Sequence, residues 1–583
     1  MSVGSGANLR FDGAAAAPMT RSNTIALYVA VWLFLITFMI YPILHVVKEA
    51  FISDQHGFTL DFLWEVFANP IYVEGLWNSL VMAVFSTLLA FLIAMPLAWV
   101  SDRFRFPGKA VLSSAILVPL ILPPFVGAIG IKHLIGPDGA LNALLALIGL
   151  VDPARPIDWL GESRLTGVVL LNALHLYPIL LLNISAALAN IDPAMEEAAA
   201  NLGCPGWKKF LRVTFPLAMP GIFAGGTVVF VWAFTELGVP LIFDYPRVVS
   251  MQIWEGLKDL SGNPFPYALV VVVLGISSLI FLLSKRFFGR DDFASVGRAS
   301  MATSARQPDR PWQRWACTAL FAGVTAVALL PHLGVLFVSF SHDWYQSVIP
   351  KSFTWQNYSD ALGDPRTVGS IANSLKYASL STIVDLALGV SIAWLVCRTT
   401  LPGRRWLDLL AMLPLAVPGL VLAFGYLAMT REGRPFHFLM PHDNPIIILV
   451  IAYSVRRLPY IVRSAIAGFQ QTSVTLEEAA QNLGCPPART FWRVTAPLIT
   501  ANLVAGGLLA FAFAMLEVSD SLILAQKQEH FAITTAIYDL FGALGSGEGM
   551  ASALGVWSMI FLALTIIGAS VVLGKKLGAL FRV

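Results

Sequence analysis

Apolar runs of about 20 residues recur about a dozen times along this chain of 583 residues, and a helix of that length crosses the hydrocarbon core of a bilayer. Hydrophobic residues make up 57% of the sequence and charged residues only 13%, and the mean hydropathy is +0.72. Such a composition excludes an ordinary soluble globular protein. The alternating pattern of a membrane β-barrel is absent. The sequence therefore predicts an all-α polytopic membrane protein.

We expect about twelve transmembrane helices. Their starts lie near residues 24, 76, 110, 165, 219 and 264 in the first half of the chain, and near residues 313, 373, 406, 444, 498 and 553 in the second. If the helices alternate in direction, the basic residues between them, such as Arg103, Lys208 and Arg489, fall on one side of the membrane. By the positive-inside rule that side is the cytoplasm, and both termini lie on it.

The two halves of the sequence repeat one another. Three short motifs recur at one offset of 295 residues, namely Asn-Ser-Leu at Asn78 and Asn373, Ala-Trp at Ala98 and Ala393, and Pro-Gly at Pro107 and Pro402. Further along the offset falls to 281, so the second half lacks some 14 residues of an outward-facing loop. Each half then holds six helices. Because six is even, the halves are expected to be parallel repeats about an axis along the membrane normal.

The predicted organisation follows from this repeat. Residues 1–22 are expected to form a cytoplasmic tail, and residues 286–312 a polar cytoplasmic linker. The two membrane domains are residues 23–285 and residues 313–583. Each domain contains one copy of a repeated polar segment, at residues 193–216 and 474–497.

The repeated segments read EEAAANLGCPGWKKFLRVTFPL from Glu196 and EEAAQNLGCPPARTFWRVTAPL from Glu477. In the first copy a helix is expected from Pro193, because carboxylates in its first turn favour the positive end of the helix dipole and alanines follow. Gly203 is expected to end that helix. A second, amphipathic helix is expected to lie along the membrane face until Pro216 ends it.

The order of residues in both segments resembles the EAA loop of type I ATP-binding-cassette (ABC) importer permeases. The matching residues are Glu197, Ala198, Ala199, Gly203, Val213 and Pro216, and again Glu478, Ala479, Ala480, Gly484, Val494 and Pro497. The resemblance implies that each segment is a coupling helix seated in a groove of a separate ATPase subunit. The candidate coupling residues are then Glu196, Glu197, Ala198, Ala199 and Gly203, with Glu477, Glu478, Ala479, Ala480 and Gly484. The alternative is an amphipathic helix that only packs at the membrane surface.

The chain contains no GxxxxGKS/T phosphate-binding loop, so it cannot bind ATP in that way. The resemblance therefore implies that ATP and Mg are used by partners, two cytoplasmic ATPase subunits for the two coupling segments. The chain itself is expected to be a transport subunit of a bacterial inner membrane and not an enzyme. No bound cofactor, no metal site and no nucleic-acid partner is expected.

Two glutamates lie at depth in equivalent helices. Glu236 and Glu517 are related by the 281 offset, and an ionisable residue inside a membrane is a functional candidate because its burial is costly. In one interpretation the two carboxylates, with Asp520 nearby, form an acidic lining or gate of the translocation pathway. In the other, each carboxylate caps a neighbouring helix without touching substrate.

The halves differ in the fourth helix of each, which precedes the helix with the glutamate. There His175 of the first half aligns with Arg456 of the second, and Arg457 adds another positive charge in the second half only. These arginines could bind an anionic substrate or a counter-anion. The favoured alternative is that one arginine pairs with an acid such as Asp385 and the other extends to the membrane surface.

Prolines and glycines interrupt the third helix of each half. They are Pro119, Pro123, Pro124, Gly127 and Gly130 in the first half, and Pro414, Pro418 and Gly419 in the second. Broken helices often line transport pathways, because the freed backbone groups need a polar neighbour or a cavity. Pro123 and Pro418 are therefore pathway candidates. Kinks that only shape packing are the alternative.

A single chain with two six-helix halves, each with an EAA segment, resembles the permease group for iron(III), thiamine and 2-aminoethylphosphonate. The resemblance implies alternating access, with substrate delivered by a periplasmic binding protein. We expect ferric iron as the substrate, and 2-aminoethylphosphonate, thiamine or another small solute as alternatives. A secondary transporter of the major-facilitator type also has two parallel halves, but the doubled EAA segment argues against it. A channel or scaffold is a third alternative.

Overall fold

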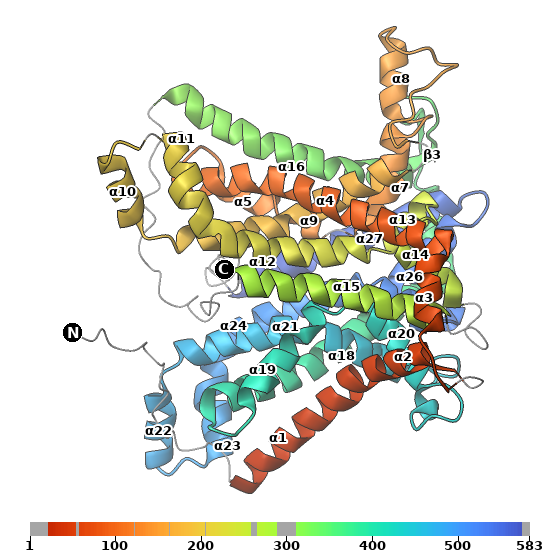
Figure 1. Cartoon of the computed structure of the whole chain (residues 1–583). Coiled ribbons are helices and arrows are strands. Elements are labelled where there is room, and N and C mark those ends of the chain that lie inside the picture. Colours follow the sequence, from red (N-terminus) through yellow and green to blue (C-terminus); the bar gives the residue numbers. More distant parts are fainter. Residues whose placement is uncertain are drawn as a thin grey trace.

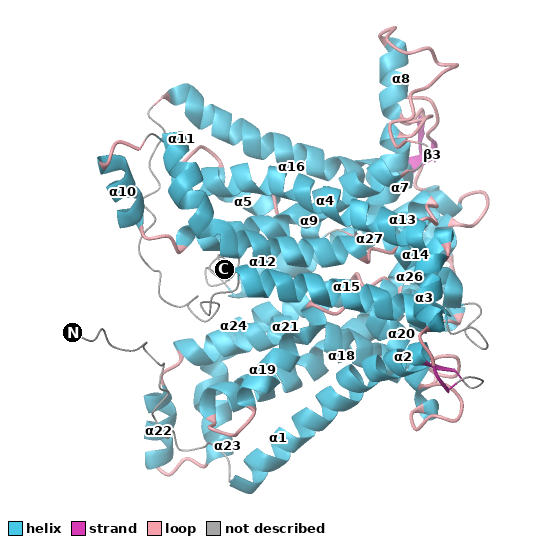
Figure 2. Cartoon of the chain, viewed as in Figure 1, coloured by secondary structure: helices cyan, strands magenta, loops and turns pink. Residues whose placement is uncertain are grey.

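The computed structural model describes residues 21–53, 57–121, 123–161, 164–204, 206–257, 265–288 and 310–573. Over this part of the chain the fold is almost entirely helical (Figures 1 and 2), which confirms the expected class. Two short antiparallel strand pairs are β1 (Ile52–Ser53) with β2 (Gly57–Phe58), and β3 (Ser341–Asp343) with β4 (Ser352–Phe353). Ile52 is opposite Phe58, and Ser341 is opposite Phe353. Most of the expected tail and linker lies outside the described residues.

The helices of the first half are α1 (Arg21–Leu35), η1 (Ile36–Ile40), α2 (Tyr41–Phe51), α3 (Asp61–Ala68), α4 (Pro70–Arg103), α5 (Lys109–Ala115), α6 (Val118–Ile121), α7 (Pro124–Ile135), α8 (Ala140–Leu147), α9 (Leu165–Ala189), α10 (Pro193–Asn201), α11 (Gly206–Lys209), η2 (Phe210–Thr214), α12 (Phe215–Phe234), α13 (Gly238–Phe243), α14 (Val249–Gly256) and α15 (Phe265–Phe288).

The helices of the second half are α16 (Pro311–Phe340), α17 (Gln356–Gly363), α18 (Pro365–Arg398), α19 (Arg404–Met412), η5 (Leu413–Leu415), α20 (Gly419–Met429), η6 (His437–Leu439), α21 (Ile446–Gln471), α22 (Val474–Asn482), α23 (Pro487–Thr490), η7 (Phe491–Thr495), α24 (Ala496–Met515), α25 (Ser519–Leu524), η8 (Gln528–His530), α26 (Ile533–Phe541) and α27 (Gly547–Leu573).

Each membrane helix expected from the sequence has a counterpart in the structure. In the described part of the chain, nine helices are long and apolar enough to span a membrane, and two bent pairs raise the number to eleven. The remaining expected helix, near residue 444, is α21, which packs between α18 and α24. Its three arginines, Arg456, Arg457 and Arg463, set it apart from the apolar spans.

The third helix of each half is broken, as the prolines predict. The pair α5–α6 and α7 meets at 96°, and the pair α19–η5 and α20 meets at 103°. Pro123 and Pro418 are both in an extended conformation, and a new helix starts directly after each of them. A proline has no amide hydrogen, so a helix cannot continue through it with all its hydrogen bonds.

One expectation about the repeated segments is wrong, because Pro216 does not end a helix. A single helical rod runs from Gly206 to Phe234 through α11, η2 and α12, and the second half repeats it from Pro487 to Met515. At the π turn η2 the amide of Phe215 donates to the carbonyl of Phe210. A new α-helical stretch starts there, and proline fits its first turn. The amphipathic piece is therefore the start of a spanning helix.

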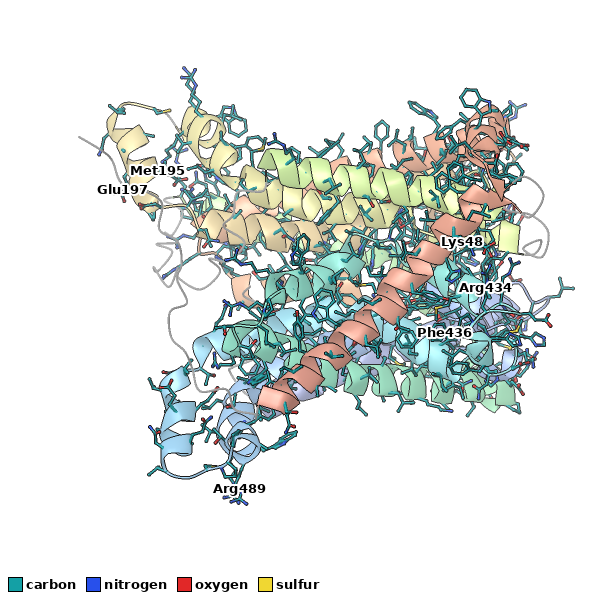
Figure 3. The ribbon with its side chains drawn as sticks, turned by 60° about the horizontal axis from the view of Figure 1, so that its bottom comes forward. Lys48, Met195, Glu197, Arg434, Phe436 and Arg489 are labelled. Atoms are coloured by element: carbon teal, nitrogen blue, oxygen red, sulfur yellow. The ribbon has the colours of Figure 1, made fainter. Side chains whose placement is uncertain are left out.

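The first helix of each half packs against the other half. The N-terminal rod of α1 and α2 lies against α18 and α20, and α16 lies against α7. Figure 3 shows this N-terminal rod crossing the bundle obliquely, with Lys48 near its far end. The two halves are therefore joined by an exchange of helices as well as by their central interface.

A glycine at the same repeat position permits each of these crossings. Gly130 on α7 meets Pro331 on α16, and Gly425 on α20, at the 295 offset, meets Pro42 on α2. A Cβ on Gly130 would overlap the carbonyl oxygen of Pro331, and a Cβ on Gly425 would lie 2.9 Å from the carbonyl oxygen of Pro42. Backbone therefore meets backbone across the two halves, and any larger side chain must separate them.

Leucine in place of Gly130 or Gly425 should destabilise the fold, because overpacking of this kind costs about 1–3 kcal/mol. Each variant should unfold at a lower temperature than the parental chain in the same detergent. Gly323→Leu on α16 is the matched control, since no atom of another described residue beyond its chain neighbours and its own helix backbone lies within 4 Å of a Cβ there. Equal unfolding midpoints for all three variants would show that the contact is unimportant.

Candidate functional site

The two repeated segments, residues 193–216 and 474–497, are called the coupling segments from here on. In both, a short helix ends in a left-handed glycine, Gly203 with φ +77° and Gly484 with φ +81°. The same two hydrogen bonds close each turn, from the glycine amide and from the amide of the following cysteine to carbonyls of the helix. The predicted helix–glycine–helix order is therefore present in both copies.

Both coupling segments lie at one end of the bundle. In Figure 1, α10 and α11 stand at the same end as α22 and α23, and α13, α14 and α26 stand at the opposite end. Figure 3 places Met195 and Glu197 at the tip of the first segment and Arg489 at the tip of the second. Two similar surfaces are thus presented on one side of the molecule.

The first glutamate of each segment points into the protein. Glu196 is buried and forms an ion pair with Arg103 at the end of α4. Glu477 is buried as well, and its two carboxylate oxygens lie 3.2 and 3.3 Å from Nε of Arg398 at the end of α18. Arg103 and Arg398 are related by the 295 offset, so one ion pair is built twice. Glu196 and Glu477 therefore fasten each coupling segment to its membrane helix.

The electrostatics of the first pair favour its ionised form. Burial by itself raises the pKa of Glu196, but hydrogen bonds from Arg103 and Thr214 lower this pKa below its ordinary value. The ion pair therefore stabilises the folded segment at neutral pH. That contribution is lost as the pH falls through the lowered pKa.

The next residues of each segment face outward. Glu197 and Ala198 are exposed; of their counterparts in the second segment, Ala479 is exposed and Glu478 is partly exposed. Leu202 is 88% exposed and Leu483 is 89% exposed, and the equivalent pair Met195 and Leu476 is half exposed. Large apolar side chains at equal positions on two protruding segments are typical of surfaces that bind a protein partner. We call these eight residues, Met195, Glu197, Ala198, Leu202, Leu476, Glu478, Ala479 and Leu483, the coupling surface.

A second site lies between the two halves. It is a cavity of about 80 Å³ where the end of α12 meets the break before α20 and the middle of α21. Its lining residues are Val231, Trp232, Thr235, Glu236, Pro414, Leu415, Val417, Pro418, Gly419, Leu420, Arg456, Arg457, Tyr460 and Ser519. Four pathway candidates from the sequence, Glu236, Pro418, Arg456 and Arg457, therefore meet in this central cavity. Pro123 is not among its lining residues.

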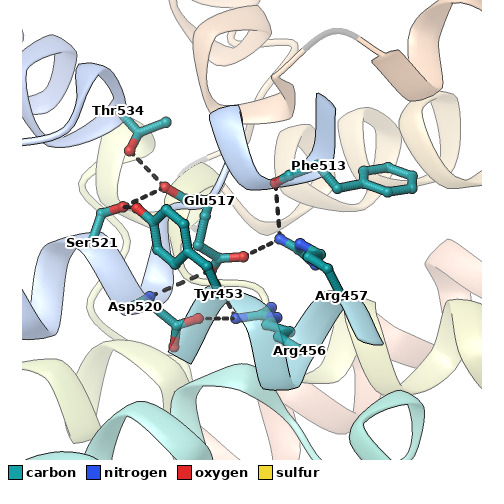
Figure 4. Close-up of polar contacts among 8 residues, drawn as sticks. All are labelled: Tyr453, Arg456, Arg457, Phe513, Glu517, Asp520, Ser521 and Thr534. Atoms are coloured by element: carbon teal, nitrogen blue, oxygen red, sulfur yellow. Dashed lines mark hydrogen bonds and ion pairs between the residues drawn. The ribbon is translucent and has the colours of Figure 1, made fainter. Parts of the chain in front are cut away.

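The two arginines share one carboxylate (Figure 4). Nη1 of Arg456 lies 2.7 Å from Oε1 of Glu517, and Arg457 pairs with Oε2 of the same glutamate. Asp520 lies 3.5 Å from Arg456. The expectation that one arginine pairs with Asp385 is wrong: both carboxylate oxygens of that buried aspartate are without a hydrogen-bond partner. Glu517 is the nearer acid because the chain breaks after α24 and turns its carboxylate toward α21.

The two equivalent glutamates have different surroundings. Oε1 of Glu236 accepts hydrogen bonds from the amides of Gly238 at 3.0 Å and Val239 at 3.3 Å, and so caps α13. Glu517 accepts from the amide of Asp520 at 3.4 Å, at the start of α25, in addition to both arginines. Each glutamate therefore caps the short helix that follows it, as one of the two interpretations expected.

Sequence reasoning missed the aromatic pair at the centre of the interface. The rings of Trp232 and Phe513 lie edge to face, with centroids 6.5 Å apart. These residues are related by the 281 offset, so the two helices meet at equivalent positions near the pseudo-twofold axis. The offset was the signal that could have revealed them.

Among the described residues, no group of three or more His, Cys, Asp and Glu side chains is placed to hold a metal ion. The central cavity therefore offers a mixed lining of two guanidinium groups, one carboxylate and several hydroxyl and aromatic groups. Such a lining can bind a polar or charged solute without metal coordination.

Comparison with known proteins identifies the family. Residues 78–291 and 385–574 each match the family described as "Binding-protein-dependent transport system inner membrane component". These two matches cover more than half of the chain, so it belongs to that family. The first helix of each half lies outside the matched ranges, and these are the two helices that pack on the opposite half.

Several relatives match one or both halves. The ferric transport system permease protein FbpB of Actinobacillus pleuropneumoniae is 26% identical over 512 residues, which cover 85% of this chain and 71% of the relative. The probable ABC transporter permease protein y4fN of Sinorhizobium fredii is 26% identical over 491 residues, with coverages of 83% and 84%. The molybdenum transport permease ModB of Escherichia coli is 27% identical over 227 residues, covering 37% of this chain and 94% of ModB.

The family settles the class of protein. The chain is the permease component of a binding-protein-dependent ABC importer and a multi-pass inner-membrane protein. It is a transport subunit and not an enzyme, and its family works with ATPase and binding-protein partners. Permeases of this family need no cofactor, because the partner ATPases hydrolyse the ATP.

Valine in place of both Gly203 and Gly484 should abolish ATP-driven transport while the chain still inserts into the membrane. A β-branched residue at positive φ is strained, at a cost of about 1–2 kcal/mol at each site, so each turn should change direction. Uptake by proteoliposomes containing the complete transporter measures the effect. Gly206→Val is the control within the same segment, since its φ is not positive. Parental transport by the double variant would refute the role of these turns.

Proposed function

We propose that the coupling surface seats two cytoplasmic ATPase subunits, one on each coupling segment. The end of the bundle that carries both segments, together with both termini, then faces the cytoplasm, and the opposite end receives a periplasmic binding protein. The four large apolar side chains at equal positions, led by Leu202 and Leu483, are the observation that carries this proposal. These side chains lie on segments that protrude from the helix bundle (Figure 1), where a protein partner can cover them.

Motion of the ATPase subunits would reach the membrane domain through the buried ion pairs. Glu196 with Arg103 and Glu477 with Arg398 join each coupling segment to α4 or α18. Because each first helix crosses to the other half, a movement of one half pulls on a helix that packs against the other. The central cavity lies on the interface that such a movement would open and close, as alternating access requires.

We propose ferric iron as the substrate. Three relatives that match across both halves are named as ferric permeases, one of them as "putative", at 23–26% identity. The described residues offer no cluster that would hold a metal ion permanently, and a transport pathway needs none, because a tightly held ion would not be released. A second candidate is 2-aminoethylphosphonate, favoured by Arg456 and Arg457 in the central cavity.

Aspartate in place of both Leu202 and Leu483 should prevent the ATPase subunits from binding, since a charge replaces the exposed apolar side chain at the centre of each contact. The ATPase should no longer co-purify with the permease, and ATP-driven uptake of radioactive iron into proteoliposomes should stop. Leu544→Asp is the control for co-purification of the ATPase, because Leu544 is 99% exposed between α26 and α27, away from the coupling segments.

Two results would contradict this proposal, one for the binding of the ATPase subunits and one for the substrate. Normal ATPase co-purification with the Leu202→Asp/Leu483→Asp variant would show that the coupling surface does not bind the ATPase subunits. ATP-driven uptake of 2-aminoethylphosphonate without uptake of iron would leave the coupling intact and replace the substrate.

A further inference from the structure

Several buried charges of the central interface are present in the second half only. Arg456 and Arg457 replace His175 and Leu176 of the first half, and Asp520 replaces Val239. The two halves of the interface are therefore alike in backbone but unlike in charge. A pathway for a neutral solute would need no such difference, since buried charges are costly in a membrane.

The two arginines bring more hydrogen-bond donors to the central cavity than the protein uses. Nη2 of Arg457 donates to Glu517 and to the carbonyl of Phe513, but its Nε is buried without a partner. Arg457 is only 7% exposed and lines the cavity. A buried guanidinium N–H without an acceptor is costly unless a ligand or water supplies one.

The nearby carboxylates are occupied elsewhere. Glu517 and Asp520 pair with the arginines and are not among the residues that line the cavity. Glu236 does line it, but two backbone amides of α13 already bind its Oε1. Among the residues that line the cavity, Glu236 is therefore the one acid, and Arg456 and Arg457 supply the guanidinium donors.

The backbone adds further hydrogen-bond donors at the cavity. Helix α20 begins at Gly419, so the positive end of its dipole lies at the cavity. A Cβ at Gly419 would overlap the guanidinium of Arg456, so only glycine lets the arginine reach this helix start. The cavity of about 80 Å³ has room for several water molecules or for a small oxyanion group.

We propose that the central cavity binds an anionic oxygen group of the substrate, of the carboxylate or phosphate type, through Arg456, Arg457 and the start of α20. This inference rests on the proposed import function. No described cluster of His, Cys, Asp and Glu is placed to coordinate a bare trivalent cation, whereas both guanidinium groups line the cavity and can donate hydrogen bonds to an anionic group. Iron would therefore pass as a complex with an anionic ligand. A free oxyanion would satisfy the same site.

Binding of radiolabelled inorganic phosphate and of radiolabelled citrate to the complete transporter in lipid nanodiscs tests the site. The parental protein should show saturable binding of at least one of them. Arg456→Gln should weaken that binding roughly tenfold or more, because a charge-assisted hydrogen bond is lost. Arg463→Gln is the matched control on the same helix, since Arg463 is exposed and pairs with Asp408 outside the cavity. Absence of saturable binding of either anion by the parental protein overturns the proposal.

A second variant separates anion binding from a structural ion pair. Arg456→Gln alone leaves Glu517 with one arginine, so the fold could suffer. The double variant Arg456→Gln/Glu517→Gln removes one charge of each sign, and Gln keeps the size of the Glu517 side chain. Anion binding should stay weakened in the double variant. Parental anion affinity in the double variant would mean that Arg456 serves only to neutralise Glu517, and the proposal would be wrong.

Uptake into proteoliposomes distinguishes the two sources of the anion. With doubly labelled ferric citrate, entry of iron and citrate together identifies an anionic iron complex as the substrate. Entry of phosphate or citrate without iron identifies a free oxyanion, which refutes ferric transport but keeps the anion site. Entry of iron alone, at a rate that Arg456→Gln does not change, refutes the anion site and leaves the proposed ferric import standing.

Discussion

A lipid bilayer offers no hydrogen-bond partner to the backbone, and this constraint decides where the chain can depart from a helix. The breaks at Pro123 and Pro418, and those that follow α12 and α24, all lie where the two halves meet or where another helix crosses. At those places side chains or neighbouring backbone satisfy the freed groups, as Glu236 does for α13. The central cavity lies where the break at Pro418 meets those that follow α12 and α24.

The coupling segments are firmly attached to the membrane helices, and the two halves are attached to one another. The buried glutamate of each coupling segment pairs with the last arginine of a long membrane helix, so the protruding segments are not loose loops. The crossing helices held at Gly130 and Gly425 join the halves to one another. A force applied at the coupling surface therefore has a continuous path of packed and ion-paired residues to the central cavity.

Much of this could be predicted from the sequence, because repetition carries positional information. The offsets of 295 and 281 locate the broken helices, both coupling glycines and the pair Glu236 and Glu517. Contacts between distant segments could not be predicted. The acid that pairs with Arg456 depends on how the chain turns before α25. The packing of the first helix of each half against the other half cannot be seen in the hydropathy of the sequence. The prediction that Pro216 ends a helix is wrong because a π turn directly precedes a new α-helical stretch in which this proline fits the first turn.

The central claim is that both coupling segments bind ATPase subunits and move with them. Spin labels at Leu202→Cys and Leu483→Cys, in a chain whose four native cysteines are replaced, test it directly by the distance between the labels. In the complete transporter the labels should be immobilised, and their separation should shorten when ATP is bound. Labels that stay mobile, at a separation that ATP does not change, would contradict the claim.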